Sequence, residues 1–125
     1  LGRHTGYTEF VEIVVKAGRG DLRFAGALLG GTHSRIVRIG EFHVDVVPTG
    51  TLIVLRNHDV PGVIGRVGTL LGDHGINIAE YHQARQAKDG DALAAVAVDG
   101  DVAIAVRDAI LDLDEVSKAV VVRLG

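Results

Sequence analysis

Apolar and polar residues follow two different periods along this chain. In the first part, short runs rich in β-branched, aliphatic and aromatic residues predict strands. These runs span 7–16, 22–29, 34–39 and 42–47. Pro48-Thr49-Gly50 then interrupts the pattern, because proline cannot donate in a β-ladder and glycine relaxes the chain. We therefore expect a β-rich segment over 1–48 and a separate domain over 49–125.

Beyond this boundary the pattern alternates between strand and helix. Apolar runs predict strands, and apolar residues spaced three and four apart predict helices. In chain order the expected elements are a strand at 51–56, a helix from about 61 to 74, strands from 76 to about 87 and at 92–98, a helix capped by Asp101, and a strand at 116–124. This βαββαβ order is the ferredoxin-like plan, in which two helices cover one face of a four-stranded antiparallel sheet. The expected fold class is thus α+β, a ferredoxin-like domain preceded by a small β-rich segment.

The first of these helices has two distinct faces. Its core face is predicted from the residues that recur at helical spacing, which are Val63, Ile64, Val67, Leu70 and Leu71. Another sector holds Gly62, Gly65, Gly68 and Gly72. Each glycine weakens a helix interior by about 1 kcal/mol relative to alanine. Four of them in one sector therefore indicate that something approaches the backbone closely.

Candidate binding groups surround the start of this helix. Asn57 and Asp59 lie just before it, and Asn77 lies just beyond its far end. The helix start presents unpaired N–H groups and the positive end of the dipole, which suit a carboxylate. With the carboxylate of Asp59 and the two amides, these groups could hold a free amino acid by both its charged ends. Asn77 could close over the same end of the helix or over the equivalent site of a paired subunit.

A simpler interpretation of the same residues is structural. Asp59 would then only cap the helix, and the two asparagines would be ordinary turn residues.

The run from Asn57 to Gly65, NHDVPGVIG, resembles the signature of ACT domains, specifically those at the C-terminus of D-3-phosphoglycerate dehydrogenase. The likeness continues through Leu71-Gly72 and through Gly75-Ile76-Asn77-Ile78-Ala79. It implies a regulatory domain that binds L-serine, the end product of the pathway, at a dimer interface for feedback control.

The resemblance also implies which residues bind L-serine. The positions that match the family's ligand residues are Asn57, Asp59 and Asn77. The expected site includes four further residues of the same loop and helix start, which are Val60, Gly62, Val63 and Ile64.

The segment before the boundary resembles the second half of the intervening domain that precedes the ACT domain in long dehydrogenases of this kind. In some of them that domain binds a phosphorylated anion, which suggests Arg35 as one residue of an anion site. Val47 and Ala97 stand at what we take to be the other two basic positions of that site. The alternative is that Arg35 belongs to a solvated basic face at the edge of the sheet.

Composition narrows the classes of function. Of the 125 residues 47% are hydrophobic and only 4% aromatic, so we expect an aliphatic core. Because the formal net charge is −3, we do not expect the chain to bind nucleic acid or an anionic membrane through a basic surface. The chain has no cysteine, and no apolar run reaches the length needed to span a bilayer. We expect a soluble, cytoplasmic protein.

No group of residues in the sequence indicates catalysis or metal binding. The six histidines lack the paired spacing of a metal site, and the glycine-rich stretches lack the strand-turn-helix context of a dinucleotide site. We therefore expect no catalytic residue, metal or cofactor on this chain. Because the sequence contains no methionine, we expect a fragment, and the resemblance implies NAD only in a missing N-terminal part.

The expected partners are a small amino acid and further copies of the chain. The strand start at 76–81 carries only Glu80 as a charge, so little protects this edge from pairing, and we expect a homodimer or a higher homo-oligomer. Two other functions stay open. The chain could be the regulatory portion of an L-serine dehydratase, whose loop resembles this one less, or a constitutive dimerisation module that binds no ligand.

Overall fold

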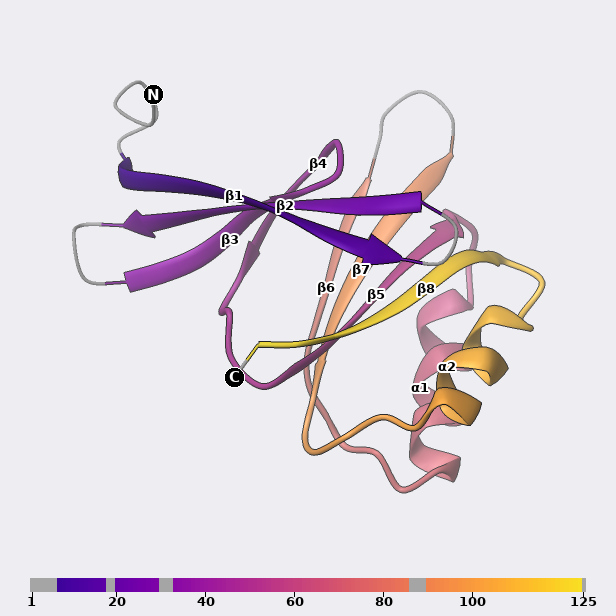
Figure 1. The fold of residues 1–125 in the computed structure, drawn as a ribbon. Helices are drawn as coiled ribbons and strands as arrows, with labels where there is room; N and C mark the ends of the chain where they lie inside the picture. Colours follow the sequence, from indigo (N-terminus) through magenta and orange to yellow (C-terminus); the bar gives the residue numbers. More distant parts are fainter. Residues whose placement is uncertain (1–6, 18–19, 30–32, 86–89, 125) are drawn as a thin grey trace. The chain divides into compact units, whose positions relative to one another are not determined.

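The computed structural model describes residues 7–17, 20–29, 33–85 and 90–124, whose helices and strands are shown in Figure 1. The chain divides into two compact units, Leu1–Pro48 and Thr49–Gly125. Each unit has a four-stranded sheet of its own.

The first unit is a meander of antiparallel strands. It contains β1 (Tyr7–Ala17), β2 (Gly20–Leu29), β3 (His33–Ile39) and β4 (Phe42–Val46), and the sheet order is β1-β2-β3-β4. Each expected strand is present. Along β4 buried and exposed residues alternate, as expected for a strand with one face turned to a core.

The second unit has the expected ferredoxin-like order. Its elements are β5 (Thr51–His58), α1 (Val63–Asp73), β6 (Ile78–Arg85), β7 (Asp91–Val98), α2 (Ile104–Leu111) and β8 (Val116–Arg123). The sheet order is β6-β7-β5-β8 with every neighbouring pair antiparallel. Figure 1 shows both helices on the same face of this sheet. The α+β prediction is therefore confirmed. The expected end of the third strand, at about residue 87, lies outside the described residues.

The core of this unit lies between the sheet and the two helices. It is aliphatic, as the composition predicted, and its fully buried members include Ile53, Leu55, Val67, Leu71, Val96 and Ile110. On α1 the predicted core face is confirmed for Val63, Val67 and Leu71, which are buried, and Leu70 packs against the core from its margin. The prediction is wrong for Ile64, which is 52% exposed.

The helix ends also differ in detail from the prediction. The helix α1 begins at Val63 rather than at Pro61, because Gly62 adopts a left-handed conformation with φ of 92° and serves as the N-cap. Asp101 is not the cap of α2. The N-cap is Ala103, and Asp101 instead forms an ion pair with Arg123 of β8, with 2.9 Å between Oδ1 and Nη1.

Candidate functional site

Asp59 directly follows β5, and its carboxylate contacts two side chains of β6. The distance from its Oδ2 to Nε of Arg85 is 3.0 Å, and its Oδ1 accepts a hydrogen bond from Nε2 of Gln83 at 3.4 Å. The Asp59 N–H also donates to the carbonyl of Gly90 at 2.6 Å. No side chain caps α1. The interpretation of Asp59 as a helix cap is therefore wrong.

The strand register explains how these residues meet. Arg85 of β6 pairs with Ala92 of β7, which pairs with Asn57 of β5. Directly opposite residues of neighbouring strands share a face, so Arg85 and Asn57 lie on the same face of the sheet. Two residues earlier, Gln83 is aligned in the same way with core residues of β7 and β5, so this is the face that the helices cover.

Asn57 is buried at this corner of the domain, with only 3% of its surface exposed. Its Nδ2 donates to the carbonyl of His58 at 2.9 Å. Its Oδ1 is buried and has no donor within the described part of the chain. Most buried polar atoms in proteins have a hydrogen-bond partner, so this acceptor is an exception that needs an explanation.

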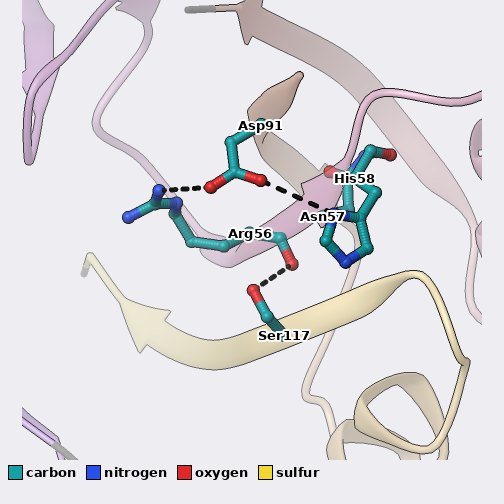
Figure 2. A network of polar contacts seen from close by, with 5 residues as sticks. All are labelled: Arg56, Asn57, His58, Asp91 and Ser117. Atoms are coloured by element: carbon teal, nitrogen blue, oxygen red, sulfur yellow. Dashed lines mark hydrogen bonds and ion pairs between the residues drawn. The ribbon is translucent and has the colours of Figure 1, made fainter. Parts of the chain in front are cut away.

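The two neighbours of Asn57 on β5, Arg56 and His58, belong to a separate network on Asp91, shown in Figure 2. Nη2 of Arg56 lies 3.2 Å from Oδ2 of Asp91, and Nδ1 of His58 lies 3.6 Å from the other carboxylate oxygen. Ser117 of β8 donates to the carbonyl of Arg56 at 3.3 Å. These contacts fix the end of β5 between β7 and β8, so they anchor the strand from which the candidate loop departs.

Asn77 lies at the opposite end of the sheet from Asn57. It precedes Ile78, which pairs with Val98, and Val98 pairs with Thr51 at the start of β5. Asn57 is near the other end of β5, roughly 20 Å away at about 3.3 Å per residue. Within one chain Asn77 therefore cannot close over the start of α1. Its Nδ2 instead donates to Oδ2 of Asp99 at 2.9 Å.

The start of α1 is held by an ion pair across its outer surface. Arg66 lies against Gly62, where an added Cβ would come within 2.8 Å of Nη1. Arg66 reaches Glu115, with 2.7 Å between Nη2 and Oε2, and the Glu115 carbonyl accepts the His58 N–H at 2.9 Å. Glu115, one residue before β8, thus contacts both the end of β5 and the first turn of α1.

The model of the ACT domain family matches residues 51–115. The chain belongs to the ACT domain family.

Relatives of the chain include D-3-phosphoglycerate dehydrogenases. The chain is 36% identical to the enzyme of Bacillus subtilis over 76% of its own length and 18% of that protein. It is 41% identical to the enzyme of Archaeoglobus fulgidus over 58% of the chain and 14% of that protein. A match to the enzyme of Methanocaldococcus jannaschii covers 94% of the chain and 22% of that protein at 27% identity. The matches span only 14% to 22% of the length of these relatives. It is a regulatory ACT domain with a preceding segment, homologous to the regulatory part of these dehydrogenases.

The other expected site residues of the ACT domain differ in exposure. Val63 is buried in the core at 3% exposure, so its side chain serves packing. Val60 and Ile64 are 46% and 52% exposed. Together with Gly62 they give the start of α1 an apolar outer surface.

The glycine sector of the ACT domain is open. A Cβ added at Gly65, Gly68 or Gly72 would meet nothing within 4 Å among the residues that the structure describes. Packing among these residues therefore does not require glycine at the three positions.

Arg35, the candidate anion residue, forms an ion pair across the β3–β4 hairpin. Its Nε lies 3.1 Å from Oδ1 of Asp45. The anion site stays a prediction, and this carboxylate is a competitor for any anion that approaches Arg35.

Sequence reasoning did not find Gln83 and Arg85, the two partners of Asp59. Both lie on β6, two residues apart, so they share a face. Two polar residues at the end of a strand face that the helices otherwise cover were a signal that the sequence could have provided. The strand register that brings this pair to Asp59, however, joins segments that are distant in sequence.

Two further findings concern the described residues. No helix among them is long and apolar enough to cross a membrane, and they include no cluster of three or more potential metal ligands.

Proposed function

We propose that this chain is the amino-acid-sensing regulatory part of a D-3-phosphoglycerate dehydrogenase and that its ACT domain binds L-serine for feedback control of serine synthesis. The observation that carries the proposal is the Asp59 carboxylate, which belongs to the loop between β5 and α1 and contacts β6, together with the start of α1, which no side chain caps. In this proposal Asp59 takes the ammonium group of the ligand. The unpaired N–H groups of the first helical turn take its carboxylate.

Asn57 supports the same site. Its buried Oδ1 has no donor in the described chain. Leaving a buried acceptor unpaired costs free energy that a bound donor removes. The ammonium and hydroxyl groups of L-serine are such donors, so ligand binding would complete the hydrogen bonding of Asn57.

Asn77 enters the site from a second copy of the chain. Within one chain it lies at the wrong end of the sheet, but two-fold association is the commonest closed symmetry and places the same surface of both copies in contact. Three observations favour contact through β6 and α1. β6 is an edge strand of its sheet, the glycine sector is open, and Val60 and Ile64 are exposed. The proposed ligand therefore lies between two subunits and stabilises their association.

The rest of the proposed enzyme lies outside this chain. We place the NAD site and the active site there, and we place the whole protein in the cytoplasm. The relatives described above are named D-3-phosphoglycerate dehydrogenase, which supports the dehydrogenase over the dehydratase alternative.

The test is calorimetric titration and thermal unfolding of the 125-residue chain with L-serine, glycine and L-aspartate. A ligand that binds only the folded state stabilises it by RT ln(1 + [L]/Kd), which is about 2.7 kcal/mol at a concentration of 100 Kd. We expect L-serine to raise the melting temperature most. No heat and no shift at millimolar L-serine, from a chain that nevertheless dimerises, would leave a constitutive dimerisation module as the function.

A further inference from the structure

Arg85 and Asp59 place opposite charges side by side at the corner of the domain where α1 begins. Their contact uses Nε of Arg85 and Oδ2 of Asp59, at 3.0 Å. An arginine carries a fork of five N–H donors, so the Nε contact leaves the terminal donors of the fork unused by this pair. The Arg85 side chain is 68% exposed, and the Asp59 side chain is 26% exposed. A small polar molecule can therefore reach both charged groups.

An α-amino acid carries its ammonium and carboxylate groups on one carbon atom. Its recognition therefore requires an acceptor with a donor beside it, which is the arrangement of Asp59 and Arg85. Guanidinium groups bind carboxylates through charge-assisted and often bidentate hydrogen bonds. We propose that Arg85 binds the carboxylate of the ligand together with the N–H groups of the first turn of α1, while Asp59 binds its ammonium group, so that Arg85 selects amino acids over simple amines. This inference rests on the proposed function and adds a second charged residue to that site.

The surroundings hold this pair of charges in place. Gln83 donates to the second carboxylate oxygen of Asp59, and the backbone N–H of Asp59 donates to Gly90 just before β7. These contacts orient the carboxylate toward β6. The buried, unpartnered Oδ1 of Asn57 is an independent sign of a ligand at this corner, because Asn57 aligns with Arg85 through a single residue of β7.

The experiment measures the affinity of the whole chain for three probes by calorimetry. L-Serine has both charged groups, ethanolamine lacks the carboxylate, and 3-hydroxypropionate lacks the amine. We expect the unaltered chain to bind L-serine well and the other two weakly. Arg85→Ala should weaken L-serine binding about tenfold or more, as for loss of a charge-assisted contact. Arg85→Ala should leave ethanolamine binding nearly unchanged, so the preference for L-serine over ethanolamine should fall. Arg85→Lys should keep part of that preference.

Arg123→Ala is the matched control. Arg123 also forms one exposed ion pair from the end of an edge strand, but with Asp101 at the opposite end of the sheet. This variant should bind L-serine like the unaltered chain. Far-UV circular dichroism of each variant reports folding, and Arg85→Gln replaces Arg85→Ala if the alanine variant does not fold.

The outcomes separate the two proposals. An unaltered chain that binds no amino acid overturns the proposed function and the role of Arg85 together. Binding of L-serine that is unchanged in Arg85→Ala overturns only the role of Arg85. Tighter binding in that variant also overturns it, because it would show Arg85 competing with the ammonium group for Asp59.

Discussion

Asn57 and Asn77, two of the residues expected to bind one ligand, lie at opposite ends of the same sheet. The register settles this, because Asn77 adjoins the pair formed by Val98 and Thr51, whereas Asn57 is near the far end of β5. A single copy of the chain cannot bring both amides to one small ligand. If both bind it, each site is made from two chains.

Mixed dimers provide the first test. Asp59→Ala and Asn77→Ala should each abolish L-serine binding in pure form, because every site then lacks one partner. In a mixed dimer one site lacks both residues and the other is intact. Mixing the variants after subunit exchange should therefore restore calorimetric binding to a fraction of the sites. If binding does not return although the subunits exchange, the two residues do not belong to a shared site.

The second prediction separates the charge of Asp59 from its packing. Asp59→Asn keeps the shape of the side chain but removes its charge, so we expect L-serine binding to fall about tenfold or more. Stability should change by less than about 1 kcal/mol, because an ion pair with a partner as exposed as Arg85 contributes little. Asp101→Asn is the control, because it neutralises another exposed ion pair at the other end of the sheet. A large loss of stability in urea with unchanged affinity would show that Asp59 is structural.

The order of elements could be predicted from the sequence because local patterns determine it. Helical spacing of Val63, Val67 and Leu71 identified α1 and its core face. The same rule failed at Ile64, which is exposed. Helical spacing cannot show how wide the buried face of α1 is, because its margin depends on how the sheet and α2 pack against it. Asp101 failed as a cap because a distant arginine of β8 takes its carboxylate.

The candidate site could be predicted only where it is local. Asp59 and the start of α1 are close in sequence, so the loop itself indicated them. The contact between Asp59 and Arg85 depends on which strands are neighbours and on their register. Neither can be predicted from the local pattern of apolar and polar residues. The position of Asn77 depended on the same long-range information, which is why two arrangements stayed open until the register was known.

The third prediction contrasts two glycines of α1. Gly65→Ala should stabilise the isolated subunit by about 0.5–1 kcal/mol, because alanine favours the helix and its Cβ would meet no described residue within 4 Å. Gly62→Ala should destabilise it, because the φ of 92° is unfavourable for alanine, and the guanidinium of Arg66, 2.8 Å from the added Cβ, would have to move aside. Urea unfolding at a protein concentration where the chain is monomeric measures both. If Gly65→Ala destabilises the monomer, the sector has a role within the chain.

The last prediction concerns the surface through which two copies meet. Ile64 is 52% exposed on α1, beside the open glycine sector and the candidate loop. An exposed isoleucine contributes little to the fold of a single subunit, so Ile64→Lys should change monomer stability by less than about 0.5 kcal/mol. At a subunit interface the same change buries a charge without a partner, which costs several kcal/mol. We therefore expect Ile64→Lys to weaken self-association by at least about a hundredfold.

Ile104→Lys is the matched control for this substitution. Ile104 is 71% exposed at the start of α2, on the helix that the proposed interface does not use. Light scattering and analytical ultracentrifugation with and without L-serine should show a dimer for the unaltered chain and for Ile104→Lys, and a monomer for Ile64→Lys. Because the proposed ligand touches both subunits, Ile64→Lys should also weaken L-serine binding although Ile64 carries no polar group. If Ile64→Lys dimerises normally, or if Ile104→Lys is the variant that dissociates, the chains meet through another surface and Asn77 does not complete the site.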